Sequence, residues 1–233
     1  MWIIRVMVLS FFYMTNVSAD SSASTGKIII DGYEMGGSDS TIKGSRVKHT
    51  IDRTLSGFSS VKTDGPFEII YRHGEPSLSI SGDKNIIQHV LVQESSGNLD
   101  ISIKQSFSSY YPLVIKMASK KIESITMEGT STMTLEDIST GQLTINLIGT
   151  VDIVASGRAT RLDLNIQGTG DVKARKLKAD YVSVNLEGTS DVELTATQAL
   201  NIDISGVGDI LYFGRPKEIS KQISGVGDIE AGE

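Results

Sequence analysis

A seven-residue motif, of which one copy reads Ile166-Gln167-Gly168-Thr169-Gly170-Asp171-Val172, occurs six times in the second half of the chain. Each copy has an apolar residue two positions before its glycine and another four positions after it. The glycines lie 20, 19, 20, 18 and 19 residues apart, at Gly129, Gly149, Gly168, Gly188, Gly206 and Gly225. A fixed period of this length is typical of stacked repeat proteins rather than of compact α/β domains.

The residues before each glycine alternate between apolar and polar. The apolar positions include the pairs Ile125/Met127, Ile145/Leu147, Leu164/Ile166, Val184/Leu186 and Ile202/Ile204. Alternation with period two predicts a strand with one face in the core and the other in water. We therefore predict an all-β fold, a right-handed parallel β-helix-like solenoid with coils of about 19–20 residues, whose strands stack about 4.8 Å apart. An antiparallel sandwich is the alternative.

The chain before the repeats predicts short strands and hairpins. Four runs of suitable length and composition are Phe67 to Tyr71, Ser77 to Ile80, His89 to Gln93, and Leu99 to Ile103. Turn-forming residues separate these runs, and the region from Asp83 to Val92 has room for one helical turn at most.

The first nineteen residues predict a signal peptide. Arg5 precedes a mostly apolar run from Val6 to Val17, and Val17-Ser18-Ala19 matches a signal peptidase site. We expect the mature chain to begin at Asp20, with a flexible Ser/Gly-rich segment over residues 20–46 and one domain over residues 47–233. The signal peptide predicts export of the mature chain, to the periplasm or cell surface of a bacterium. No other apolar run reaches transmembrane length.

Charge and composition exclude several classes of function. The 22 Lys and Arg against 28 Asp and Glu give a net charge of −6, and removal of Arg5 with the signal peptide would make it −7. An acidic chain of this kind is a poor partner for nucleic acid. The absence of Cys excludes disulfides, thiolate metal sites and cysteine nucleophiles.

The sequence gives no combination of residues that indicates catalysis. It has no phosphate-binding loop, serine-nucleophile elbow or zinc-protease motif, and its histidines, His49, His73 and His89, all lie before the repeats. We predict no cofactor and no metal site. The repeated aspartates are compatible with calcium binding, although an Asx-type turn, in which each carboxylate accepts a bond from nearby backbone, fits the adjacent glycines better: Asp152, Asp171, Asp191, Asp209 and Asp228.

Three groups of residues are candidates for an interaction surface. The first is an aromatic patch in a Ser-rich segment, Phe107, Tyr110 and Tyr111. The second is a basic cluster that either holds an anionic glycan or forms a solvated edge: Arg158, Arg161, Lys173, Arg175, Lys176 and Lys178. The third is a row of threonines, each directly after a repeat glycine, that either docks on a regular surface or reflects ordinary β-propensity: Thr130, Thr150, Thr169 and Thr189.

Several motifs resemble the head GIN domain family, whose members are described as "putative autotransporter adhesins". They are Phe58-Ser59-Ser60-Val61, Gly65-Pro66-Phe67-Glu68-Ile69, Leu78-Ser79-Ile80-Ser81-Gly82-Asp83 and the later Gly-x-Gly-Asp copies, in that order. The resemblance covers the chain from Val47 onward. It implies a β-helix of parallel coils and an adhesin-like role.

These observations favour an exported, non-enzymatic interaction module of the cell surface or envelope. Its partner would be an envelope protein or a glycan, neither of which the sequence identifies. Two alternatives are a structural periplasmic protein and a β-helix carbohydrate-active enzyme, either a polysaccharide lyase or a hydrolase. The enzyme would need clustered carboxylates in a cleft, whereas the repeats space their aspartates evenly.

Overall fold

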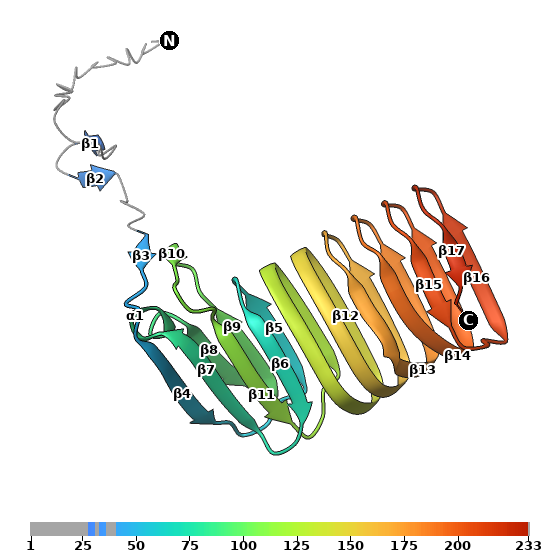
Figure 1. The fold of residues 1–233 in the computed structure, drawn as a ribbon, viewed down its shortest axis with the longest axis horizontal. Coiled ribbons are helices and arrows are strands. Elements are labelled where there is room, and N and C mark those ends of the chain that lie inside the picture. Colours follow the sequence, from blue (N-terminus) through green and yellow to red (C-terminus); the bar gives the residue numbers. More distant parts are fainter. Residues whose placement is uncertain (1–27, 31–32, 36–40, 233) are drawn as a thin grey trace, which may run out of the picture. The chain divides into compact units, whose positions relative to one another are not determined.

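The computed structural model describes residues 28–30, 33–35 and 41–232 (Figure 1). The chain divides into two units, Met1–Ser40 and Thr41–Glu233. In the first unit, β1 (Ile28–Ile30) and β2 (Tyr33–Met35) form an antiparallel pair. The predicted signal peptide, residues 1–19, lies outside the described residues, and the predicted domain boundaries stay predictions.

The second unit is almost entirely β-structure, built on one mixed sheet of 13 strands. Its single α-helix among the described residues is the one-turn α1 (Lys84–Ile87), and none of its described helices has the length and apolar character to cross a membrane. The strands are β3 (Ile42–Lys43), β4 (Lys48–Thr54), β5 (Ser60–Asp64), β6 (Glu68–His73), β7 (Ser77–Asp83), β8 (Leu91–Ser95), β9 (Asn98–Ser102), β10 (Phe107–Ser108), β11 (Val114–Ser119), β12 (Ser124–Ile166), β13 (Val172–Leu186), β14 (Val192–Ile204), β15 (Ile210–Phe213), β16 (Glu218–Ile223) and β17 (Ile229–Ala231).

The early strands confirm the predicted runs, but they do more than precede the repeats. β7 pairs antiparallel with β4 on one side and with β11 on the other, and β8 and β9 form an antiparallel hairpin. β5 and β6, however, pair in parallel with β12, so that Ser60 lies beside Ser124 and Glu68 beside Thr132. The early strands therefore continue the same sheet as the repeats, which a sequence period confined to the second half could not reveal.

The later strands are parallel and in register (Figure 1). Leu164 in β12 pairs with Val184 in β13, Val184 pairs with Ile202 in β14, and Ile202 pairs with Lys221 in β16. The chain thus returns to an equivalent position after each copy of the motif, which is the repeat period expected from the glycine spacing. Register shifts, such as that between Ala174 and Lys178, interrupt the pairing within each copy.

The apolar member of each alternating pair lies in the core. Leu164, Val184 and Ile202 are each 1% exposed, in one continuous row of aliphatic side chains. Burying such a side chain contributes about 1.5–3 kcal/mol, so the repeated rows are the main source of stability. The alternation predicted from the sequence is therefore confirmed.

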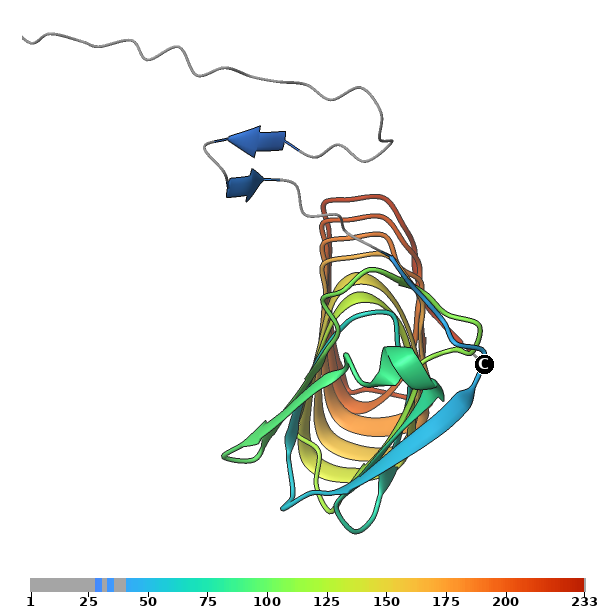
Figure 2. The ribbon, with the colours of Figure 1, turned by 90° about the vertical axis from the view of Figure 1, so that its left-hand side faces the viewer.

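The two ends of the stack differ. At the β4 end, α1 places Ile86 and Ile87 in the core, at 0% and 3% exposure, and Figure 2 shows this helix between the strands in a view along the stack. At the other end, Ile219 and Ile223 of β16 lie in register with core residues of β14, yet each side chain remains 45% exposed. The core is therefore covered by a helix at one end and left partly open at the other.

The close approach of neighbouring strands requires glycine at the later repeat positions. A Cβ atom added to Gly206 would overlap the carbonyl oxygen of Gly188, and one added to Gly188 would overlap that of Gly168. Both residues have backbone angles that other amino acids adopt. Steric contact between copies, rather than a left-handed conformation, thus explains glycine at these two positions.

Candidate interaction surfaces

The predicted aromatic patch is only partly exposed. Tyr110 is 64% exposed and packs edge-on against Tyr111, with ring centroids 5.0 Å apart. Phe107 instead pairs with Ile42 through β10 and β3 and packs against the core. The structure therefore leaves two of the three predicted aromatic residues as a surface pair, with Phe107 as part of their support.

A buried carboxylate holds the two tyrosines in place. Asp83 is 0% exposed, and its Oδ2 accepts backbone hydrogen bonds from Tyr110 at 2.7 Å and Tyr111 at 3.0 Å. Its Oδ1 accepts a third from the N–H of Arg46, at 2.7 Å. Burial by itself raises the pKa of Asp83, but the three N–H donors together hold it below its ordinary value of 3.8. An ionised Asp83 thus ties residues 46 and 110–111 to the end of β7.

Cationic side chains lie over both rings. The guanidinium carbon of Arg46 is 5.5 Å from the Tyr110 ring centroid, and the Lys48 Nζ is 6.0 Å from that of Tyr111. These distances fit cation–π contacts. The patch is therefore a mixed surface of cations and tyrosines rather than a bare aromatic platform.

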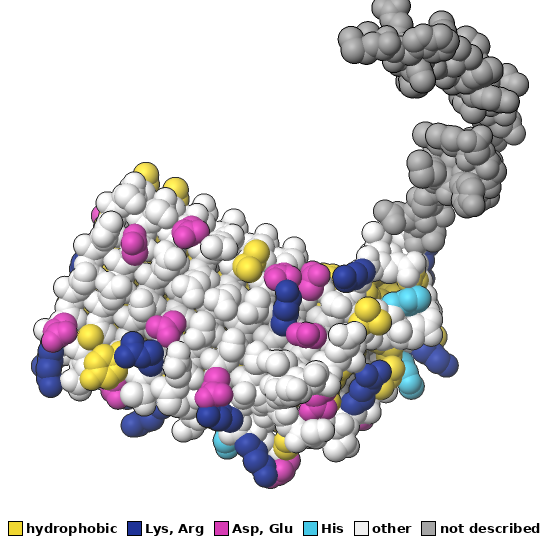
Figure 3. All heavy atoms as spheres, turned by 180° about the vertical axis from the view of Figure 1, so that it is seen from behind, with side chains coloured by type: hydrophobic (Ala, Val, Ile, Leu, Met, Phe, Trp, Pro, Cys, Tyr) yellow, Lys and Arg dark blue, Asp and Glu magenta, His cyan; other side chains and the backbone are white. Residues whose placement is uncertain are grey.

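The predicted basic cluster is not one patch. Arg175 stacks on the Phe213 ring, 3.8 Å from its centroid, and Lys173 lies 3.9 Å from Asp171. Lys176 pairs in register with Ser156 and is exposed. On the face shown in Figure 3 the Lys and Arg side chains are scattered, and many lie next to Asp or Glu side chains. Successive residues of β13 point to opposite faces of the sheet, and the register shifts change these directions again. The basic residues are therefore divided among different parts of the surface.

Two members of the cluster do meet. Arg158 in β12 lies directly beside Lys178 in β13, and both are exposed. They line a groove of about 440 Å³ together with hydroxyl-bearing side chains, Ser139, Thr140, Thr160 and Thr197. Asp180 lines the same groove and accepts a hydrogen bond of 2.7 Å from the Thr197 hydroxyl.

Arg161 adjoins a second groove, which the sequence did not indicate. It lies beside Tyr181 in register, with its guanidinium carbon 5.5 Å from the ring centroid, and Tyr181 is 43% exposed. The groove has a volume of about 370 Å³, and Ser183, Asn201 and Ser220 contribute to its lining. The sequence could have predicted that Arg161 and Tyr181 are neighbours, because Tyr181 follows Arg161 by one repeat period.

Three of the four predicted threonines form a row, without Thr130, and two valines extend it. Thr150, Thr169 and Thr189 form successive parallel bridges, and Val207 and Val226 continue the row. All five side chains are exposed, the two valines at 49% and 68%. The row is a regular strip of hydroxyl and methyl groups along one side of the repeats.

The repeated aspartates bond between copies rather than within a local turn. The Oδ1 atoms of Asp152, Asp191 and Asp209 accept hydrogen bonds from the backbone N–H of the next aspartate in the row, at 2.9, 3.0 and 2.9 Å. The predicted Asx-type turn is therefore wrong in its partner for these three aspartates, because in-register stacking brings the amide of the next copy to each of their carboxylates. Within the part of the chain that the structure describes, no three His, Cys, Asp or Glu residues form a group able to hold a metal ion.

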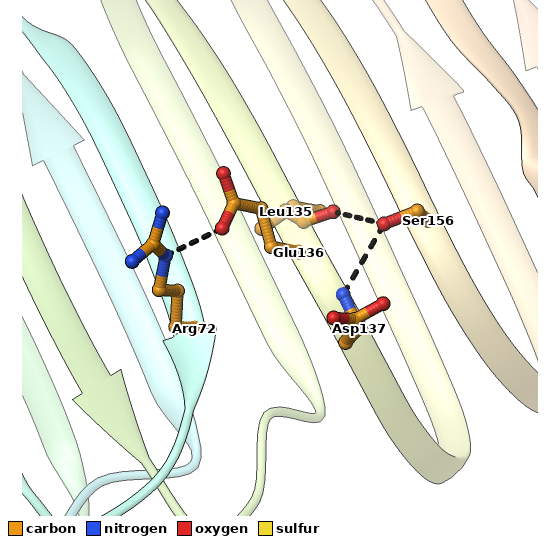
Figure 4. Close-up of polar contacts among 5 residues, drawn as sticks. All are labelled: Arg72, Leu135, Glu136, Asp137 and Ser156. Atoms are coloured by element: carbon orange, nitrogen blue, oxygen red, sulfur yellow. Dashed lines mark hydrogen bonds and ion pairs between the residues drawn. The ribbon is translucent and has the colours of Figure 1, made fainter.

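A corner between copies is fixed by backbone and side-chain bonds (Figure 4). Asp137 has a left-handed φ of 51°, and its N–H donates to the Ser156 hydroxyl at 3.2 Å. That hydroxyl in turn donates to the Leu135 carbonyl at 3.3 Å, while Arg72 and Glu136 form an ion pair across neighbouring strands. The surfaces above therefore lie on a framework with internally bonded corners.

Family comparison adds to this geometry. Residues 57–216 match the family described as "Putative auto-transporter adhesin, head GIN domain". The chain belongs to this family. The resemblance inferred from the early Gly and Phe motifs is thereby confirmed, and no protein of curated function matches the chain.

Solved structures share the fold of this head GIN protein. A crystal structure described as a "putative adhesin" from Bacteroides fragilis aligns with a TM-score of 0.69 at 24% identity, over 82% of this chain and 100% of that one. A "putative adhesin" from Parabacteroides merdae gives 0.52 at 19% identity, over 83% and 99%. A "putative lipid binding protein" from Parabacteroides distasonis gives 0.52 at 20% identity, over 82% and 100%.

Proposed function

We propose that this protein is an exported, non-enzymatic interaction module of the cell surface or envelope. The observation that carries the proposal is the set of regular exposed rows on the sheet, of which the row from Thr150 to Val226 is the clearest. Membership of a family named for adhesins supports the same conclusion. A repeated face of this kind offers many equivalent contacts, which suits binding to an extended partner, an envelope protein or a glycan.

The finer architecture that we propose is a right-handed parallel β-solenoid with coils of about 19–20 residues. The in-register parallel pairs between equivalent positions of successive copies support it. In such a solenoid the exposed rows would repeat about every 4.8 Å, the spacing of paired strands. The proposed binding face would then be both flat and periodic.

Export by a signal peptide over residues 1–19 is part of the proposal. Mass spectrometry of the protein from an expressing bacterium should find Asp20 as the N-terminus, and retention of residues 1–19 would contradict export by cleavage. Protease treatment of intact cells separates the two locations. Digestion before lysis indicates the cell surface, and digestion only after outer-membrane disruption indicates the periplasm.

The interaction function is tested by adherence and capture. Cells lacking the gene should adhere less to a polysaccharide-coated or protein-coated surface, or lose an envelope partner recovered by crosslinking, and the wild-type gene should restore the loss. Normal adherence together with no crosslinked partner would refute the proposal. A screen of polysaccharides for chain cleavage tests the enzyme alternative, since any turnover would refute a non-enzymatic role.

A further inference from the structure

Arg158 and Lys178 are two like charges on directly adjacent strands. Parallel pairing in register places them side by side, and both side chains are exposed. Two like charges on side chains of directly paired residues repel each other. Among the described residues, neither takes part in an ion pair. An anionic group placed between them would relieve this repulsion.

The surroundings of this cation pair suit a ligand rich in hydroxyl groups. The groove of about 440 Å³ is lined by Ser139, Thr140, Thr160 and Thr197, all of which can donate and accept hydrogen bonds. The Thr197 hydroxyl already donates a hydrogen bond to Oδ1 of Asp180, the carboxylate that lines this groove. Cations and hydroxyls together are the chemistry that recognises an acidic sugar.

The second groove lies further along the same pair of strands and shares no lining residue with the first. Arg161 follows Arg158 by three residues, at most roughly 10 Å along a strand. Here the Tyr181 ring is 43% exposed, and the Arg161 guanidinium lies over one of its faces. The polar residues that also line this groove are Ser183, Asn201, Glu218 and Ser220. A pyranose ring can pack its apolar face on such an aromatic ring while its hydroxyls bond to the amide and hydroxyl groups.

We propose that the two grooves together bind an acidic polysaccharide, with anionic groups between Arg158 and Lys178 and a sugar ring on Tyr181. This proposal deepens and rests on the proposed interaction function. The complementarity is local, because the whole chain carries a net charge of −6 and would otherwise repel a polyanion. The anionic group is either a carboxylate or a sulfate ester, since both accept hydrogen bonds from these cations.

Binding is measured with three defined probes, polygalacturonate for carboxylates, dextran sulfate for sulfate esters, and dextran as the neutral control. The wild-type protein should bind at least one anionic probe and bind dextran at least tenfold more weakly. The affinity should fall as salt rises, because the contacts are ionic. The stronger of the two anionic probes then identifies the class of anionic group.

Variants separate the site from general attraction of charge. Arg158→Gln combined with Lys178→Gln should weaken binding about tenfold or more, and Tyr181→Ala should do the same. Tyr181→Phe should retain binding because it keeps the ring. Lys173→Gln is the charge control: it removes one positive charge, half the loss in the double variant, but Lys173 lies outside both grooves and beside Asp171. The affinity of this variant should be unchanged.

Failure of this polysaccharide site can be distinguished from failure of the proposed interaction function. If neither anionic probe binds, or if Lys173→Gln weakens binding as much as Tyr181→Ala, this site is refuted. Adherence or partner capture that persists in these cases would leave the interaction function standing without this ligand. Unchanged circular dichroism melting curves ensure that a loss of binding by a variant is not a loss of fold.

Discussion

The substitution Asp83→Ala should be one of the most damaging single changes in the protein. It removes the acceptor of three backbone hydrogen bonds, from Arg46, Tyr110 and Tyr111, at 2.7, 2.7 and 3.0 Å. Bonds to an ionised acceptor contribute about 1.5–3 kcal/mol each, although these donors are only partly buried and water can replace some of the loss. We therefore expect the free energy of unfolding to fall by about 3–5 kcal/mol, above the range usual for single changes.

Urea unfolding at pH 7, followed by far-ultraviolet circular dichroism, measures the loss. Asp52→Ala is the matched control, because Asp52 is an exposed aspartate on neighbouring β4 and should change stability by less than about 0.5 kcal/mol. Hydrogen exchange gives a local measurement: in Asp83→Ala the amides of Arg46, Tyr110 and Tyr111 should exchange faster. A loss of stability no larger than that of the control, or unchanged exchange at all three amides, would refute the role assigned to Asp83.

The same carboxylate predicts a pH dependence with a definite sign. The pKa of Asp83 in the folded protein lies below its ordinary value of 3.8, so the ionised group stabilises the fold. That contribution is complete above the unfolded pKa and is lost as the pH falls through the lower, folded pKa. The stability difference between wild type and Asp83→Asn should therefore shrink below about pH 4, and a difference that stays constant down to pH 2 would contradict this reasoning.

Four further predictions test other parts of the structure. Val184→Asp should cost about 3–5 kcal/mol by leaving an unpaired charge in the core, whereas Asn185→Asp on the polar face should cost about 1 kcal/mol or less; equal losses in thermal unfolding would mean that the strand faces are assigned wrongly. Gly206→Ala should cost about 3 kcal/mol or more because its Cβ overlaps a neighbouring carbonyl, and a melting temperature equal to that of wild type would argue against the close approach. Lys221 lies at the open end of the core, where its ammonium group donates to the Ile229 carbonyl at 3.0 Å. Lys221→Ile removes this charge from the open end and should increase self-association in sedimentation velocity. A variant that stays monodisperse would contradict this prediction. Calcium should raise the melting temperature no more than magnesium does, since carboxylate oxygens of the aspartate row already bind backbone amides; a rise specific to calcium would reverse this interpretation.

Periodic features were accessible from the amino-acid sequence because each repeat copy meets the same environment in its neighbours. The alternation around Val184 and Asn185 assigns one face of a strand to the core, and equal spacing then assigns the same face in every other copy. The threonine row follows by the same logic from the position after each glycine. Local pattern and repeat period are sufficient for such predictions, because parallel stacking places equivalent residues side by side.

Contacts between residues that do not belong to the repeat pattern could be identified only from the tertiary structure. Asp83 resembles any turn-forming aspartate in the sequence, and only folding brings Arg46 and Tyr110 to its two oxygens. The basic cluster likewise looked continuous, but register shifts in β13 separate Arg175 from the pair of Arg158 and Lys178. A sequence records the order of residues along a strand, whereas the direction of each side chain at a bulge or corner depends on the strands packed around it. Periodicity therefore determined the rows of this protein, including the threonine row, and three-dimensional packing determined the two grooves and the tyrosine pair.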